Sequence, residues 1–386
     1  MVKPFWRGLL AGVSPIRPET RRLGSFEITR PAAAVPDYVP EAHFSRPELL
    51  LRARYSQFAI LAAREAVRDA GLVYPETDPS QTAVVLGTGG GGEEAREEAM
   101  CRLWTSGKPR VHPAVVAKSN HQASVGLVCI DLGIRGPAFT LSTGCAAATH
   151  AIGQAFQLVR HGIVPRALAG GSEAIILFGN LLAFDAMQVL AADTCRPFSR
   201  DRNGMVFGEG AGIVVLESLR SAQERGARIY AEIAGVGMSA DASDTVHPTV
   251  DGPASAIRSA LRQGRLDPSE IDYINAHGTG TVVNDRVETQ AVRAALGPHA
   301  DRIAMSSTKS LHGHLFGGTG GVECIAAVLA LHHGIMPPTA NYLGPDPECD
   351  LDNIPNVARP RPGLRVALSH SFAFGGLNAV LAIRKF

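Results

Sequence analysis

The residue best suited to covalent chemistry in this chain of 386 residues is Cys145, which ends the motif SerThrGlyCys at 142–145. An apolar segment at 138–143 leads into this motif, and an alanine-rich segment with helical periodicity follows from Ala146. We therefore predict a strand, a glycine turn and a helix that starts at Cys145. Backbone N–H groups and the helix dipole at such a position favour a thiolate, the nucleophilic form of cysteine. A lone cysteine more often fills a core position, so this interpretation needs support from other residues.

Two further motifs place titratable side chains at the ends of apolar segments. His277 stands in AsnAlaHisGlyThrGlyThr at 275–281, and Lys309 and His314 stand in SerSerThrLysSerLeuHisGlyHis at 306–314. A single histidine at such a place is usually structural. A cysteine, two histidines and a lysine at strand-to-loop transitions are the residue types that thiolate chemistry with oxyanion stabilisation requires.

The elements that must position these residues alternate between short apolar segments and longer segments of helical periodicity, which predicts an α/β fold. Strands are expected at 82–88, 138–143, 166–174, 212–218, 229–238, 271–280, 302–310 and within 365–386, and helices at 93–104, 146–162, 253–264 and 320–334. The second half repeats the style of the first without a clear linker. We therefore predict two similar, closely packed halves, 1–228 and 229–386.

Composition excludes several classes of protein. The chain has 45% hydrophobic residues, and 37 Lys and Arg balance 36 Asp and Glu, so no global field favours nucleic acid or membrane surfaces. No stretch of ~20 apolar residues predicts membrane insertion, and the N-terminus lacks a secretory signal. Six scattered cysteines without CxxC spacing indicate reduced thiols in the cytoplasm and no metal site. These are Cys101, Cys129, Cys145, Cys195, Cys324 and Cys349.

The chain resembles the type II β-ketoacyl-carrier-protein synthases. The resemblance rests on the two motifs above, on Cys145, and on SerPheAlaPheGlyGly at 371–376, and it runs from about Arg54 to the C-terminus. GlySerGluAla at 171–174 and PheGlyGluGlyAlaGly at 207–212 also match. The resemblance implies the thiolase fold, two pseudo-symmetric halves packed in five layers αβαβα, and an acyltransferase that works as a homodimer or a ketosynthase heterodimer.

The resemblance also implies the reaction and the roles of the central residues. Cys145 would accept an acyl chain from an acyl carrier protein, and His277 and His314 would support decarboxylation of malonyl-carrier protein. The carbanion would then attack the Cys145 thioester, as in fatty acid or polyketide synthesis, polyenes included. Backbone N–H groups of Cys145 and Phe374 would form the oxyanion hole, with Phe374 as a mobile gate. No cofactor is implied besides the phosphopantetheine that the carrier protein carries.

Further residues have roles by the same resemblance. Lys309 would be held by Glu323 in a buried pair that organises the histidines. Thr279 and Thr281 match positions that hydrogen-bond the phosphopantetheine arm. Phe184 is expected to contact the substrate.

The chain departs from the family at several positions. Gly90 stands where relatives often carry a bulky apolar residue, which predicts a larger or straighter acyl pocket suited to long or rigid chains. Residues 50–51 are leucines where relatives present basic residues, so docking of the acidic carrier protein is assigned to Lys108 and Arg110. His370 replaces a common Asn, which leaves the hydrogen bonding near the gate open.

The apolar first strand typical of the family is also absent before Ser14 and Pro15. Either translation starts further upstream, or an uncovered sheet edge awaits a partner.

Three alternatives remain. A non-elongating, partner-dependent homologue would normally lack the nucleophile. A thiolase would be expected to carry a C-terminal cysteine, and none lies between residues 350 and 386. An NAD-dependent oxidoreductase would use Gly87, Gly89 and Gly92 as a GxGxxG motif, but no acidic strand end follows at the required distance.

Overall fold

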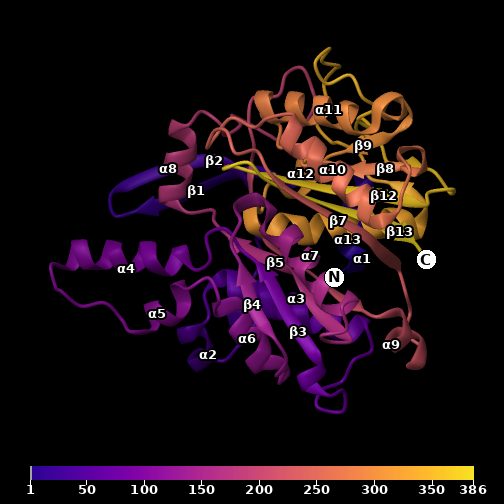
Figure 1. Cartoon of the computed structure of the whole chain (residues 1–386). Helices are drawn as coiled ribbons and strands as arrows, with labels where there is room; N and C mark the ends of the chain where they lie inside the picture. Colours follow the sequence, from indigo (N-terminus) through magenta and orange to yellow (C-terminus); the bar gives the residue numbers. More distant parts are fainter. Residues whose placement is uncertain (1) are drawn as a thin grey trace.

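The computed structural model describes residues 2–386, and its strands lie in two large sheets and one small one (Figure 1). The strands are β1 (Arg17–Leu23), β2 (Phe26–Ala33), β3 (Thr82–Gly87), β4 (Ala138–Leu141), β5 (Arg166–Ala174), β6 (Phe207–Glu217), β7 (Ala231–Ala240), β8 (Tyr273–Asn275), β9 (Ala304–Ser306), β10 (Ile335–Met336), β11 (Arg359–Pro360), β12 (Val366–Ala373) and β13 (Leu377–Lys385). The first sheet has the order β1-β2-β6-β5-β3-β4 and the second β7-β13-β12-β8-β9, while β10 and β11 pair alone.

Helices lie between the sheets and on their outer faces. They are α1 (Val2–Ala11), α2 (Arg46–Leu51), α3 (Arg54–Asp69), α4 (Glu93–Ser106), α5 (Ala114–Ser119), α6 (Ala123–Leu132), α7 (Ala147–Arg160), α8 (Phe178–Ala186), α9 (Leu219–Glu224), α10 (Asp251–Gly264), α11 (Val282–Leu296), α12 (Lys309–His312) and α13 (Thr319–His333). No helix among the described residues is long and apolar enough to cross a bilayer.

Two helices, α7 and α13, form the central layer. Ala151 and Ile152 of α7 and Ala327 of α13 belong to one buried cluster with Val85 of the first sheet and Leu381 of the second. Small side chains on both helices let the sheets approach closely on either side. With α3 and α6 outside the first sheet and α10 and α11 outside the second, the order of layers is αβαβα, as predicted.

The two halves repeat one topology. In the first, β4, β3 and β5 are parallel and β6 is antiparallel to β5. In the second, β9, β8 and β12 are parallel and β13 is antiparallel to β12. The predicted boundary near residue 228 lies between the last strand of the first sheet and the first strand of the second, and the division of the chain into two units stays a prediction.

The halves differ at one sheet edge. Strand β7 pairs along β13, whereas β6 meets β2 only at Phe207 and Gly208. Beside the remaining edge of β6 lies a cavity of about 580 Å³ lined mainly by apolar residues of α1, α3, α7 and α13. Among residues 2–386 no strand covers this edge, and α1 rather than a strand precedes Ser14, in line with the expected absence of the first strand.

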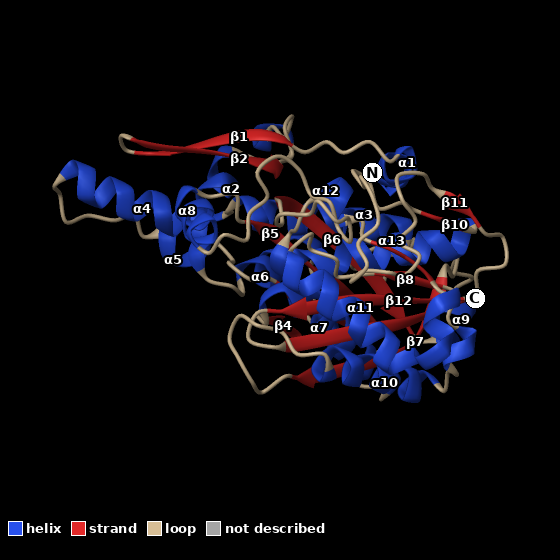
Figure 2. Cartoon of the chain, turned by 90° about the horizontal axis from the view of Figure 1, so that it is seen from above, coloured by secondary structure: helices blue, strands red, loops and turns tan. Residues whose placement is uncertain are grey.

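Parallel strands of both sheets end near one another and deliver the predicted site residues. Strand β4 ends four residues before Cys145, β8 two before His277, and β9 three before Lys309. Strand β12 ends immediately before Phe374. Away from this region, the β1–β2 hairpin and α4 project from the body of the molecule (Figure 2). The strands predicted at 271–280 and 302–310 are shorter in the structure. Strands β8 and β9 end at the first residue of the motifs 275–281 and 306–314 and have three residues each.

Candidate active site

Cys145 lies where the sequence places it, at the start of a helix. A 3-10 turn, Gly144–Ala146, runs directly into α7, and Gly144 has a φ of +56°, which a residue without Cβ adopts most readily. Gly87 at the end of β3 packs against this helix start, since a Cβ on it would lie 2.3 Å from the Ala147 carbonyl carbon. Cys145 is consequently buried, with 7% of its surface exposed.

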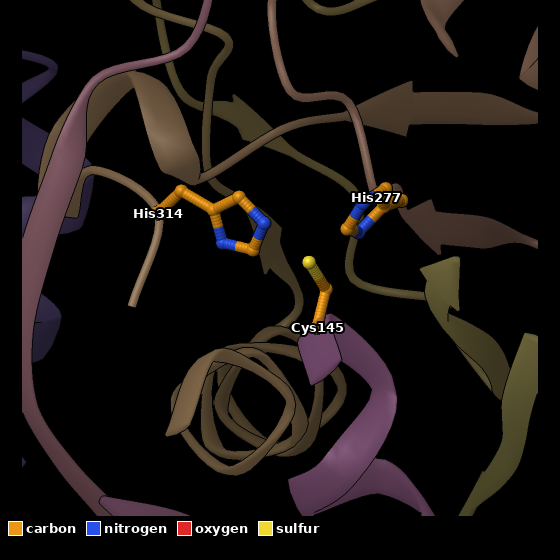
Figure 3. A group of neighbouring side chains, drawn as sticks. All are labelled: Cys145, His277 and His314. Carbon is orange, nitrogen blue, oxygen red and sulfur yellow. The ribbon is translucent and has the colours of Figure 1, made fainter. Parts of the chain in front are cut away.

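Two histidines from the second half of the chain flank the thiol. The Cys145 sulfur and one ring nitrogen from each of His277 and His314 all lie within 4.8 Å of one another. Figure 3 shows the Cys145 side chain pointing between the two imidazoles. The ring centroids are 5.4 Å apart and the rings are nearly perpendicular, at 82°. The structure therefore brings together three of the residues predicted to be catalytic.

The proton position on His314 follows from its partners. Its Nδ1 accepts the N–H of Phe316 at 3.1 Å and lies 2.9 Å from the Thr319 hydroxyl. A neutral imidazole that accepts at Nδ1 carries its proton on Nε2. That Nε2 is buried without a hydrogen-bond partner among the described residues, and the ring stacks on Phe316 at 4.7 Å. His314 is thus held as an N–H donor next to the thiol.

His277 is fixed through its backbone. The Lys309 Nζ donates to the His277 carbonyl oxygen at 2.5 Å and to Glu323 Oε1 at 2.6 Å. Both side chains of this ion pair are fully buried, so the pair that the resemblance implied is present. The Glu288 carboxylate accepts the His277 N–H at 2.8 Å. The imidazole itself has an unpaired, buried Nδ1 among the described residues.

Burial decides the resting charge of these groups. It raises the pKa of the Cys145 thiol to about 11, although the Lys309 charge and the N–H groups of Phe374 and Cys145 act in the opposite direction. Burial and the Lys309 charge also hold the pKa of His277 and His314 well below the usual value. Burial of the sulfur therefore opposes the thiolate that the helix start favours. These directions favour a neutral thiol between two neutral imidazoles at rest.

Distance alone would also allow a metal ion at these three residues. The Phe316 N–H argues for a different use, because it keeps Nε2 of His314 protonated and unable to offer a lone pair. The nearby ammonium of Lys309 would also repel a cation. The absence of a metal site stays a prediction.

A cavity of about 350 Å³ opens to the thiol. Cys145, His277 and His314 lie in its lining together with Thr279 and Thr281, whose hydroxyls are 2.9 Å apart. These two threonines therefore lie on the path to the thiol, as the proposed contact with a phosphopantetheine arm requires.

Phe374 also lines this cavity and is 38% exposed. Its backbone N–H interacts with the Cys145 sulfur, as does the N–H of Cys145 itself. The assignment of these two N–H groups to an oxyanion hole stays a prediction. Gly375 and Gly376 follow with φ of +80° and +69°.

Four other predicted residues do not line this cavity. Gly90 is packed rather than open, since a Cβ on it would lie 2.9 Å from Glu93 Oε2. Phe184 stacks with Phe374, which lines the cavity, at a ring-centroid distance of 6.4 Å. Lys108 and Arg110 lie in the exposed loop between α4 and α5, and their docking role stays a prediction.

Two buried carboxylates that hold the site loops were not assigned roles from the sequence. Glu173 lies on β5 and accepts N–H groups of Gly89, Gly90 and Gly317, at 2.5, 3.2 and 3.1 Å. Glu288 on α11 accepts the N–H groups of His277 and Gly278. An acidic residue inside the otherwise apolar segment 166–174 was a usable signal for Glu173. No local pattern distinguishes Glu288 from a surface glutamate.

Glu173 also argues against a dinucleotide site. A GxGxxG loop binds pyrophosphate through its backbone N–H groups. Here the N–H groups of Gly89 and Gly90 already bind the Glu173 carboxylate, which is fully buried. The loop therefore has a structural partner where a cofactor phosphate would bind.

Comparison with known proteins gives a consistent assignment. Residues 1–222 match the family model for the β-ketoacyl synthase N-terminal domain, and residues 230–343 match the model for the C-terminal domain. The chain is 47% identical to nodulation protein E of Rhizobium sp. (strain N33), covering 99% of this chain and 94% of that protein. It is 41% identical to 3-oxoacyl-[acyl-carrier-protein] synthase 2 of Synechocystis sp., covering 100% and 94%.

Solved structures agree. The ishigamide ketosynthase/chain length factor structure superposes with a TM-score of 0.93 at 36% identity, covering 100% of this chain and 95% of that chain. A type II polyketide synthase acyl-carrier protein in complex with its hexaketide-bound ketosynthase (AntDE:AntF) gives a TM-score of 0.89 at 31% identity, covering 100% and 95%.

Proposed function

This chain belongs to the β-ketoacyl synthase family, and we propose that its Cys145 carries the acyl chain during condensation with a malonyl unit on an acyl carrier protein. The observation that carries this proposal is the placement of Cys145, His277 and His314 within 4.8 Å of one another at a cavity of about 350 Å³. The chain is an acyltransferase of fatty acid or polyketide synthesis.

The first step transfers the acyl chain to the enzyme. The Cys145 sulfur attacks the thioester carbonyl of acyl-carrier protein, and the carbonyl oxygen becomes negative in the tetrahedral intermediate. The N–H groups of Cys145 and Phe374 stabilise that oxygen. Collapse breaks the bond to the phosphopantetheine sulfur, which leaves with the proton of the Cys145 thiol. Burial raises the pKa of the thiol, so loss of this proton is part of the cost of the step.

The second step generates the nucleophile. The bond between the malonyl Cα and its carboxylate breaks, CO2 leaves, and the electron pair forms an enolate of the carrier thioester. His314 offers its Nε2–H to the enolate oxygen, and His277 lies across the thiol to offer a second donor. Neutral imidazoles suit this role because their pKa values are held well below the usual range.

The third step forms the carbon–carbon bond. The enolate carbon attacks the Cys145 thioester, and the same two N–H groups hold the new oxyanion. Collapse releases the Cys145 sulfur as a thiolate, which takes up a proton from solvent to restore the thiol, and β-ketoacyl-carrier protein is the product. The carrier's own phosphopantetheine delivers both substrates past Thr279 and Thr281, so we propose no other cofactor.

We propose that the working unit is a dimer formed through β4. Strand β4 is the last strand of the first sheet, so its outer edge is unpaired in the chain described. Two exposed apolar side chains belong to this region, Phe139 on β4 itself and Ile130 on α6, which packs against β4. An unpaired edge with an apolar surround is suited to pairing with a second, related chain. Such a partner would be an identical chain or a homologous ketosynthase subunit, in the cytoplasm.

Intact-protein mass spectrometry tests the proposal. The protein and Cys145→Ala are each incubated with acyl-carrier proteins of several chain lengths, long unsaturated chains included, and malonyl-carrier protein is then added. We expect an acyl adduct on the native protein alone, followed by a β-ketoacyl product. Absence of an adduct with every donor would overturn the proposal and favour the non-elongating, partner-dependent homologue. A preference for short saturated chains would contradict the pocket predicted at Gly90.

A further inference from the structure

His370 lies behind the active site without lining its cavity. It is fully buried on β12, next to Ser369, which pairs with Asn275 at the end of β8. The chain then turns to His277 two residues after Asn275. His370 is therefore one strand away from the residue that presents an imidazole to the Cys145 thiol.

A single carboxylate connects the two histidines. The Nδ1 of His370 lies 3.1 Å from Glu288 Oε1, which also accepts the His277 N–H at 2.8 Å. The second oxygen of Glu288 accepts the Gly278 N–H at 2.7 Å. Both Glu288 oxygens accept backbone N–H groups, which is how a carboxylate binds, and His370 donates to this carboxylate when Nδ1 carries its ring proton. Nε2 of His370 is buried without a partner among the described residues, so Nδ1 alone carries this connection.

The His277 imidazole depends on this backbone anchoring. No hydrogen bond to another described side chain holds the ring, because its Nδ1 is unpaired and only its main-chain atoms have partners. Lys309 fixes the carbonyl side and Glu288 fixes the N–H side. Gly278, with a φ of +37°, turns the chain sharply directly afterwards. A shift of Glu288 would therefore swing His277 relative to the thiol.

We propose that His370 is a positioning residue for His277, acting through Glu288. Its Nδ1–H keeps the buried Glu288 carboxylate on the backbone of residues 277–278, so that the imidazole stays aligned for decarboxylation. This inference rests on the proposed function, in which the enolate needs His277. Acyl transfer to Cys145 relies on the N–H groups of Cys145 and Phe374 and does not need this alignment.

The test compares His370→Asn with His370→Leu. The two new side chains have nearly the same shape, but only Asn can donate to Glu288. Acylation is measured as adduct formation on Cys145, and decarboxylation as conversion of malonyl-carrier protein to acetyl-carrier protein without an acyl donor. We expect His370→Leu to lower the ratio of decarboxylation to acylation by about 10-fold, and His370→Asn to change it by less than about 3-fold.

A matched control on the same strand is Ser371→Ala, which removes the buried hydrogen bond to Thr149 at 2.7 Å and should leave the ratio unchanged. If His370→Leu does not fold, Glu288→Gln replaces it and should lower the ratio in the same way. An unchanged ratio in His370→Leu, or an equal fall in Asn and Leu, would overturn the inference. If the native protein forms no adduct, the proposed function fails instead, so the two failures are distinguishable.

Discussion

Replacing Lys309 by Met should extend the loss of stability with rising pH beyond about pH 8. The Lys309 ammonium and the Glu323 carboxylate are fully buried, with Nζ 2.6 Å from Oε1. Burial raises the pKa of Glu323, and the lysine charge opposes that rise. Without the lysine, the folded protein keeps the Glu323 proton to higher pH.

The sign and size follow from linkage. A glutamate in the unfolded chain titrates near ~4.3, so above that pH the unfolded state has lost a proton that the folded variant retains. The free energy of unfolding then falls by about 1.4 kcal/mol per pH unit until the folded pKa is reached. In the native protein burial raises the pKa of Glu323 to about 8 even with Lys309 beside it, so the native protein should follow this slope up to about pH 8 and then level off. For each pH unit above about 8 at which Lys309→Met still holds the Glu323 proton, the variant should lose about 1.4 kcal/mol more than the native protein.

Urea denaturation at several pH values measures this difference. The control is Lys309→Met/Glu323→Gln, which contains no titrating carboxyl at this position and should show no extra pH dependence. Parallel loss of stability in the native protein and in Lys309→Met above about pH 8 would refute the reasoning. Persistence of the steep slope in the double variant would assign it to another group.

Three further outcomes are expected. The rate of Cys145 alkylation by iodoacetamide should rise about tenfold per pH unit and reach no plateau below the thiol pKa of about 11. A plateau near neutral pH would show a resting thiolate. Cys145→Ala measures the alkylation of the other cysteines. Gly376→Ala should lower the melting temperature more than Gly375→Ala, because both glycines have positive φ but only at Gly376 would the new Cβ meet Asp241, 2.5 Å from its Cβ; equal shifts would contradict this. Phe139→Glu should convert the proposed dimer to monomers in analytical ultracentrifugation, because it places a charge at the β4 edge. The control, Phe26→Glu, changes another exposed phenylalanine and should leave the dimer intact. A dimer that persists in Phe139→Glu would place the interface elsewhere.

Sequence reasoning succeeded where the signal is local. The apolar segment, the glycine and the small residues around Cys145 define a strand-turn-helix unit, and the structure has that unit. The motifs of His277 and His314 place each histidine after a short strand, and these strands meet in one sheet. The calls that rest on charge or size, which are carrier-protein docking by Lys108 and Arg110 and a wider acyl pocket at Gly90, stay predictions, because each concerns a partner that the chain alone does not contain.

The anchoring of the site loops and the burial of the Cys145 sulfur depend on tertiary structure and cannot be predicted from local sequence. Glu173 and Gly317 are 144 residues apart, and Glu288 and His370 are 82 apart, so no local pattern reports that each carboxylate holds a site loop. The resting state of Cys145 is also a tertiary property. The helix start, visible in the sequence, favours a thiolate, but desolvation depends on what packs over the sulfur and raises its pKa to about 11. The sequence by itself determined the element on which each candidate residue lies, because backbone conformation is largely local. The fold determined that Cys145, His277 and His314 meet and how they are buried and anchored, because these contacts arise only when the two halves pack together.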